Sequence, residues 1–149
     1  EAANDVDAIL AGKTAQVDWV RFTHGDGGVR RPDLGKGIYR ALFLKLEAHA
    51  TEEQVAQFEE DLIGLAAYIP EILNWRRSRT DASGGAAAWT FVWEQEFTAV
   101  DDIKGPYVEH PYHWGYVDRW FDPEMPCRII ATTLCHTFTG IDRSLIAAG

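Results

Sequence analysis

The sequence predicts an α+β fold, in which a four-stranded antiparallel sheet carries two helices on one face. Stretches with period-two alternation, typical of strands, lie on either side of stretches whose apolar residues recur every three or four positions, typical of helices. Their order along the chain is strand, helix, strand, strand, helix, strand. With 149 residues, 46% of them hydrophobic, the chain can bury one core of ordinary domain size.

The first strand is predicted over residues 38–47. Arg40, Leu42 and Leu44 fall on one of its faces, and the residues between them fall on the other. A helix follows, because Thr51-Glu-Glu-Gln54 has the pattern of a capping box. Its apolar stripe contains Val55, Phe58, Leu62, Leu65 and Ile69. Pro70 then ends the helix.

Two more strands are predicted over residues 72–79 and 89–97, joined by a polar and glycine-rich loop. The second of these is the most regular in the chain. Trp89, Phe91 and Trp93 alternate with smaller or charged residues, so we expect three large aromatic side chains on one face.

A second helical region is predicted over residues 100–121, interrupted by Gly105-Pro106 and by Pro111. Residues 127–139 are β-branched and apolar enough to form the fourth strand. This order is that of a ferredoxin-like fold, whose helices cover one face of the sheet. We expect a second sheet, from another copy of the chain, to cover the other face and form a homodimer.

The domain is therefore expected over residues 38–140, with an N-terminal extension over 1–37 and a C-terminal tail over 141–149. The extension contains a short helical candidate at 5–11, and its glycine-rich part, 24–37, is interpreted as a flexible loop. That loop lacks the strand and helix context of a phosphate-binding motif. The extension could cover the cavity, extend the dimer contact or add a fifth strand.

Charge and composition exclude two classes of partner. A net charge of -9 without a basic run disfavours nucleic acid, and no stretch approaches the roughly 20 apolar residues that span a bilayer. Cys127 and Cys135 are placed on one strand, too far apart to bond to each other, so a reducing cytoplasm is expected. The chain begins at Glu1 without Met, which leaves a removed export signal open.

Tyr107, His110 and His113 form a cluster around Pro111. Imidazole exchanges protons near neutral pH, and a phenol can donate to a developing enolate oxygen. This combination is typical of proton abstraction beside a carbonyl group. It is also compatible with a structural turn.

The whole set of motifs resembles the stress-responsive dimeric α/β-barrel (Dabb) family. The motifs occur in family order over about residues 38–137: Tyr39-Arg-Ala-Leu-Phe-Leu-Lys-Leu, Thr51-Glu-Glu-Gln, Ile69-Pro-Glu-Ile followed by Trp75, a strand ending at Phe97, Asp102-Ile103, Tyr107, and His110-Pro-Tyr-His113. The resemblance implies a ferredoxin-like protomer that pairs with its two-fold mate to form a barrel, with a cavity in each subunit.

The family includes plant polyketide cyclases, hydroxynitrile lyases and members without known activity. In cyclases that form olivetolic acid, a tyrosine and a histidine of this motif serve the chemistry, and they match Tyr107 and His113. Two further pocket histidines of those enzymes are not matched, because Arg40 and Phe91 stand at their positions. The resemblance therefore does not imply olivetolic acid as the product.

We therefore expect His113 to be a general base and Tyr107 to stabilise an oxyanion, with capping or structural roles as the alternatives. Arg40, on an apolar strand face, needs either a protein carboxylate or an anionic group of a ligand. The expected substrate-binding residues are Arg40, Leu42, Leu44, Phe58, Leu62, Trp75, Trp89, Phe91, Trp93, His110 and Trp120. Ordinary core packing is the alternative for the aromatic residues, and a surface role is the alternative for His110.

No metal or organic cofactor is expected. His110 and His113, with Glu109 and Asp118 nearby, lack a third firm ligand, and no histidine is marked as a haem ligand. The leading hypothesis is a cofactor-independent lyase or cyclase of a small aromatic carbonyl compound. A non-catalytic dimer that binds small molecules or serves stress tolerance, and a cofactor-free monooxygenase, are the alternatives.

Overall fold

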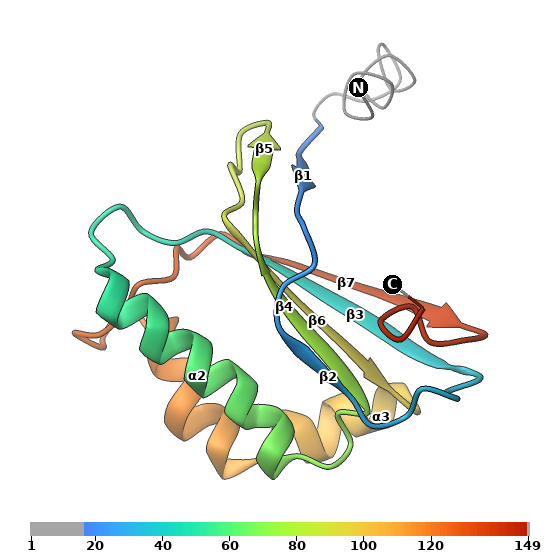
Figure 1. Ribbon diagram of the computed structural model, residues 1–149. Helices are drawn as coiled ribbons and strands as arrows, with labels where there is room; N and C mark the ends of the chain where they lie inside the picture. Colours follow the sequence, from blue (N-terminus) through green and yellow to red (C-terminus); the bar gives the residue numbers. More distant parts are fainter. Residues whose placement is uncertain (1–16, 149) are drawn as a thin grey trace.

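The computed structural model describes residues 17–148. Figure 1 shows the main sheet with its helical segments gathered on one side, and a separate small sheet beyond one end of it. The strands are β1 Trp19–Arg21, β2 Gly27–Val29, β3 Gly37–Leu44, β4 Asn74–Arg79, β5 Ala82–Gly84, β6 Phe91–Phe97 and β7 Cys135–Ile141. The helical elements are α2 Glu52–Tyr68, α3 Val100–Asp102, the π-helical turns η1 Ile103–Tyr107 and η2 His113–Val117, and the 3₁₀ turn η3 Asp118–Trp120.

Within residues 17–148, five strands form an antiparallel sheet in the order β2-β4-β6-β3-β7. The last four have the ferredoxin-like arrangement, so the predicted α+β fold is confirmed. In the register of the two central strands, Arg40 lies opposite Gln95 and Leu42 opposite Trp93. Paired residues share a face in an antiparallel sheet, so all four side chains point towards the helices.

The predicted capping box of α2 is present. The hydroxyl of Thr51 accepts from the backbone N–H of Gln54 at 3.2 Å, and the Gln54 side chain accepts from the backbone N–H of Thr51 at 3.0 Å. The helix ends at Tyr68, just before Pro70. Its buried stripe, centred on Phe58 and Leu62, packs on the sheet.

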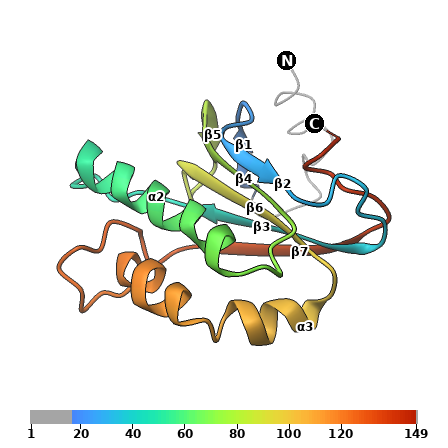
Figure 2. The same ribbon diagram turned by 60° about the horizontal axis from the view of Figure 1, so that its bottom comes forward.

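The second helical region lies beside α2 on the same face of the sheet (Figure 2). It is helical, as predicted, but two of its turns are π-helical and both prolines lie within it. Proline lacks an N–H, so regular α-helical hydrogen bonding cannot continue through it. Such turns are frequent at functional sites. Tyr107 ends the first turn, and His113 begins the second.

The opposite face of the sheet buries two carboxylates, Glu94 and Glu96. Arg76 donates to both oxygens of Glu94, at 2.8 and 3.0 Å, and Tyr39 donates to the same carboxylate at 2.7 Å. Burial and the Glu94 charge raise the pKa of Tyr39 well above its usual range. A buried charge is tolerated when it is paired and hydrogen-bonded in this way.

Trp89 does not share a face with Phe91, so this prediction is wrong. The strand begins at Phe91, and Ala88 before it has a positive φ of 50°, which turns the chain. The ring of Trp89 packs 6.4 Å from that of Phe43, on the sheet face away from the helices.

The fourth strand was predicted to begin at residue 127 but begins at Cys135. The preceding segment is irregular, apart from a bridge between Leu46 and Ile130. Cys127 lies in this segment and donates weakly to the carbonyl of Arg119 at 3.5 Å. The prediction that both cysteines lie on one strand is therefore wrong, and both are free thiols in the described structure.

The N-terminal extension contributes β2, which adds a fifth strand beside β4. Part of the glycine-rich stretch is thus a strand and not a loop. Its glycines allow close approach, because a Cβ on Gly28 would lie 2.2 Å from the Trp75 ring. The helix expected at 5–11 falls outside the described residues.

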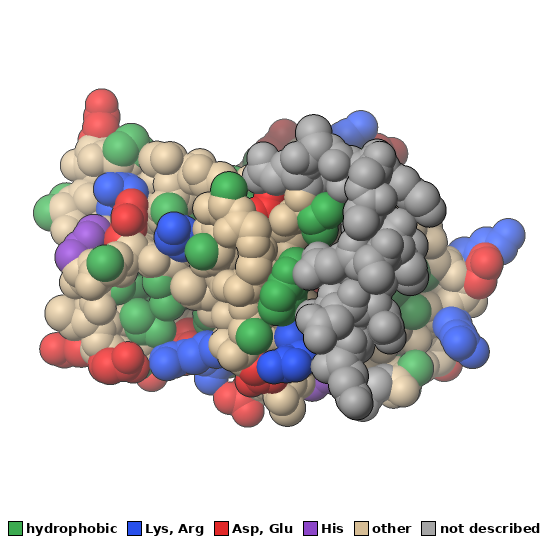
Figure 3. Space-filling view, turned by 90° about the horizontal axis from the view of Figure 1, so that it is seen from above, with side chains coloured by type: hydrophobic (Ala, Val, Ile, Leu, Met, Phe, Trp, Pro, Cys, Tyr) green, Lys and Arg blue, Asp and Glu red, His purple; other side chains and the backbone are tan. Residues whose placement is uncertain are grey.

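Acidic and basic side chains are interspersed on the face seen in Figure 3, with no single-sign stripe among the residues coloured there. Across 17–148, no helix has the length and apolar character needed to cross a membrane.

Candidate functional site

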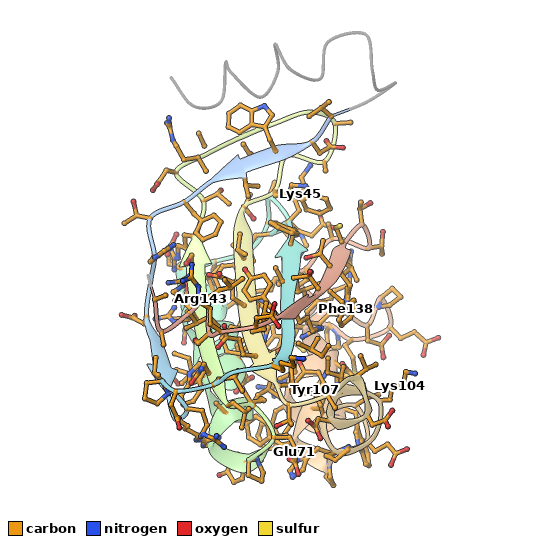
Figure 4. The ribbon with its side chains drawn as sticks, turned by 90° about the vertical axis from the view of Figure 1, so that its right-hand side faces the viewer. Lys45, Glu71, Lys104, Tyr107, Phe138 and Arg143 are labelled. Carbon is orange, nitrogen blue, oxygen red and sulfur yellow. The ribbon has the colours of Figure 1, made fainter. Side chains whose placement is uncertain are left out.

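A cavity of about 240 Å³ lies between the sheet, α2 and the second helical region. Figure 4 shows Tyr107 between the strands and the helical segment from which it projects. The lining residues are Arg40, Leu42, Leu62, Trp93, Tyr107, His113, Val117, Asp118, Phe121, Leu134 and His136. Six of them, Arg40, Leu42, Leu62, Trp93, Tyr107 and His113, are residues that the sequence marked as candidates.

The polar part of the lining centres on Tyr107. Its side chain is 2% exposed, and its hydroxyl accepts from Arg40 Nη1 at 3.2 Å. The ring is fixed edge-on between Phe97 and His113, with ring centroids 5.6 and 4.7 Å away. Since the hydroxyl oxygen accepts from Arg40, its own proton remains available to an acceptor in the cavity.

Arg40 is 3% exposed, and its Nη atoms contact neutral groups. Nη1 donates to Gln95 Oε1 as well as to Tyr107, Nη2 lies 3.3 Å from His136 Nδ1, and the guanidinium lies 5.1 Å from the centre of the Tyr107 ring. Among residues 17–148, no carboxylate lies within ion-pair distance of it. Its Nε has no hydrogen-bond partner in the described chain.

His113 lines the same cavity as Arg40 and lies beside Asp118. Its Nδ1 is 3.3 Å from Asp118 Oδ1, although the angle is not that of a hydrogen bond. The π-helical turn brings together these two residues, which are five positions apart, because the Asp118 N–H donates to the His113 carbonyl. We assign the proton of neutral His113 to Nδ1, facing the carboxylate, which leaves Nε2 as the basic atom.

His136, on β7, is a cavity residue that the sequence did not indicate. Partial burial, followed by the charges of Arg40 and His113, lowers its pKa to about 4. Because arginine only donates, His136 Nδ1 accepts from Arg40 and the ring is neutral near pH 7. His136 pairs with Leu42 of β3, and this pairing places it at the cavity. The alternation of residues within β7 does not by itself show that pairing.

The remaining wall is apolar. Leu42 and Trp93 contribute from the sheet and Leu62 from α2. The other apolar members are Val117, Phe121 and Leu134, none of which the sequence marked. Small-molecule sites usually have this arrangement, in which a few polar groups lie at one side of an apolar cavity.

Several predicted binding residues lie in the core and not at the cavity. Leu44, Phe58 and Phe91 are fully buried, and the rings of Phe58 and Phe91 pack 5.6 Å apart. Trp120 is also buried, and its indole N–H donates to Asp61 at 2.7 Å. None of these four is among the cavity-lining residues.

The other three expected binding residues are also placed elsewhere. Trp75 packs beneath Gly28, with the Arg30 guanidinium 5.0 Å from its ring centre. Trp89 lies on the far face of the sheet, as described above. The Nδ1 atom of His110 accepts from the backbone N–H of Tyr112 at 3.1 Å, which makes it a turn-stabilising residue.

Within the described range, no group of three or more His, Cys, Asp or Glu side chains has an arrangement that could hold a metal ion. His110 is turned to its own backbone, so it does not join His113 and Asp118.

A family model described as "Stress responsive A/B Barrel Domain" (Dabb) matches residues 38–132, well over half of the chain. The matched segment includes the cavity residues from Arg40 to Phe121. No curated protein matches the sequence.

Three solved structures have a similar fold. A dimeric ferredoxin-like protein of unknown function from Thermobifida fusca has a TM-score of 0.55 and 19% identity, over 80% of this chain and 100% of that one. Hydroxynitrile lyase from Passiflora edulis has a TM-score of 0.55 and 16% identity, over 75% and 99%. A dimeric protein from Bacteroides fragilis has a TM-score of 0.51 and 18% identity, over 69% and 94%. At these identities the likeness shows the fold.

Proposed function

Because the chain belongs to the stress-responsive A/B barrel family, we propose that its cavity is the active site of a cofactor-independent lyase or cyclase. The substrate would be a small aromatic carbonyl compound. The observation that carries the proposal is the meeting of Arg40, Tyr107 and His113 at one apolar cavity.

His113 Nε2 removes a proton from the carbon beside the substrate carbonyl. The electron pair moves to the carbonyl oxygen, and the Tyr107 hydroxyl donates to that oxygen as its charge develops. The Arg40 guanidinium donates to the Tyr107 oxygen and so polarises its O–H bond. Asp118 stabilises the imidazolium that His113 becomes.

In a cyclase, the enolate carbon then attacks a second carbonyl and forms a carbon–carbon bond, and the new alkoxide takes the proton back from His113. In a lyase, these steps run in reverse: His113 removes the proton of the substrate hydroxyl, the carbon–carbon bond breaks to give a carbonyl, and the carbon leaving group, an enolate or cyanide, takes that proton from His113. The cavity is smaller than the roughly 300–1,000 Å³ of sites for drug-sized ligands, which supports a substrate built on a single ring.

Proton transfer tests the proposal without the natural substrate. We expect the protein to accelerate deuterium exchange at the methyl group of acetophenone, followed by proton NMR, or release of benzaldehyde from its cyanohydrin. His113→Ala should lower the rate by about 10² to 10⁴-fold, and Tyr107→Phe by about 10² to 10³-fold. Both variants should keep the melting temperature of the wild type.

His49→Ala and Tyr116→Phe are the matched controls, because neither residue lines the cavity. They should retain the full rate. Unchanged turnover in His113→Ala would refute the proposed base. Absence of both activities, together with a lowered melting temperature in His113→Ala, would favour a structural role for the motif.

The proposed active form is a homodimer. Two of the similar structures are described as dimeric. In the described protomer β7 is an edge strand, and Thr137, Phe138 and Thr139 are exposed on both of its faces. Exposed edges of this kind are normally covered or paired. A partner there would also enclose the neighbouring His136 side of the cavity.

A further inference from the structure

Three buried N–H groups in the region of the cavity have no hydrogen-bond partner among the described residues. They are Arg40 Nε, Gln95 Nε2 and Trp93 Nε1. Arg40 is 3% exposed, and Gln95 and Trp93 are fully buried. Buried polar groups are nearly always satisfied, so three unsatisfied donors in one place call for an acceptor.

These three donors are neighbours on the sheet. Arg40 on β3 lies opposite Gln95 on β6, and Trp93 lies two positions before Gln95 on β6, on the same face. The direct contact between Arg40 and Gln95 joins them further. Both Arg40 and Trp93 line the cavity. An acceptor bound here would meet N–H groups from two adjacent strands.

The charge balance indicates an anionic acceptor. The protein groups that accept from Arg40 are Gln95 Oε1, the Tyr107 hydroxyl and a neutral His136 ring. The cavity carboxylate, Asp118, lies beside His113, and no ion pair joins it to Arg40 within the described residues. A guanidinium that loses its water without gaining an anion is costly, and a bound carboxylate removes that cost.

We propose that the ligand of this cavity is a small aromatic carboxylate, whose carboxylate is held by Arg40 with the aid of the Trp93 indole N–H group. This rests on the proposed function only in placing substrate and carboxylate in one cavity. It adds a permanent negative charge to the substrate, separate from the enolate oxygen that Tyr107 faces.

The probes are benzoate and its neutral analogue benzamide, with calorimetric titration at fixed ionic strength. We expect the wild type to bind benzoate at least 10-fold more tightly than benzamide. Arg40→Met should abolish the preference, because it keeps an unbranched apolar side chain and removes the charge and the donors. Arg143→Met, the same change at an exposed arginine outside the cavity, should leave the preference intact.

Equal affinity for the two probes, or no binding of benzoate by the wild type, would overturn the proposal. So would unchanged benzoate affinity with lowered stability in Arg40→Met, since Arg40 would then be a structural residue. Competition by inorganic phosphate as strong as by benzoate would also overturn it. The site would then bind any small anion and would not recognise the aromatic ring.

The outcome is distinguishable from that of the proposed function. His113→Ala should lose proton transfer and keep the benzoate preference. A benzoate preference in a wild type without proton-transfer activity would refute the function and leave the carboxylate site standing. Fast exchange on acetophenone without any benzoate preference would support the proposed function and refute the carboxylate site.

Discussion

His136 contributes an uncharged imidazole to the cavity from β7. Its pKa is lowered to about 4, first by burial and then by the charges of Arg40 and His113. Near pH 7 the ring therefore accepts from Arg40 and leaves its Nε2–H free to donate. On this side of the cavity the permanent cation of Arg40 therefore lies beside the neutral imidazole of His136.

This lowered pKa makes stability depend on pH. Between about pH 4 and 6.5 the unfolded chain binds a proton at residue 136 that the folded chain does not, so this contribution to stability is complete above about pH 6.5 and is lost as the pH falls towards 4. We expect His136→Gln to reduce the fall in melting temperature between pH 7 and pH 5. His49→Gln is the control, and an equal reduction in both variants would contradict this role.

At the residue scale, the sequence identified the part of the site that has a local signature. Tyr107 and His113 lie within one turn-rich segment, so their spacing was visible. Arg40 was visible as a charge on an apolar strand face. His136 was not visible, because strand pairing brings it to Arg40. Asp118 was noted only as a neighbour of His113 in sequence, and the π-helical turn that brings the two side chains together was not predicted.

At the scale of elements, α2 depends on its N-terminal cap. Thr51→Ala removes the hydroxyl that accepts from the Gln54 N–H and breaks the reciprocal pair. We expect the free energy of unfolding to fall by about 1 kcal/mol, measured by urea denaturation. Thr132→Ala, at an exposed position outside helices and strands, should change it little. A similar loss in both variants would argue against the cap.

Strand β2 depends on the absence of a side chain at Gly28. A Cβ there would lie 2.2 Å from the Trp75 ring, which would have to move. We expect Gly28→Ala to cost about 1–3 kcal/mol, the usual range for overpacking. In Gly140→Ala, at a strand position where an added Cβ meets nothing within 4 Å, no such loss is expected. Urea denaturation of the two variants compares them directly, and equal stability would refute the close contact.

Element type was predictable where a single period dominates, as in β3, α2 and β6. The residues at which these elements begin and end were not predictable. The apolar character of residues 127–134 resembles a strand, yet β7 begins at Cys135, where pairing with β3 begins. Likewise β2 forms because β4 offers an edge, and a local pattern of glycines contains no information about a distant edge.

At the scale of the whole molecule, the homodimer is open to direct measurement. Light scattering after size-exclusion chromatography should give twice the mass of the chain. Phe138, on the exposed edge strand, is 51% exposed, and Phe138→Glu should shift the population to monomer. Val108→Glu introduces the same charge at a similarly exposed site on the helical side, and this variant should remain a dimer. A wild-type monomer at micromolar concentration would refute the dimer.

Glu96 connects the two ends of the domain to its centre. One carboxylate oxygen accepts from Asn74 and Ser144, at 2.6 and 2.7 Å, and the other accepts from the backbone N–H groups of Leu145 and Ile146, at 2.6 and 3.0 Å. Asn74 in turn bonds the backbone of Arg31. The N-terminal extension and the C-terminal tail thus meet at one buried charge.

The C-terminal tail should therefore open rarely. Releasing the amides of residues 145 and 146 would strip a fully buried carboxylate of two donors, so local fraying there is as costly as breaking the sheet core. In deuterium oxide these two amides, which lie outside helices and strands, should exchange as slowly as those of β6. Segments outside helices and strands usually exchange first, and this one should exchange together with the central strands.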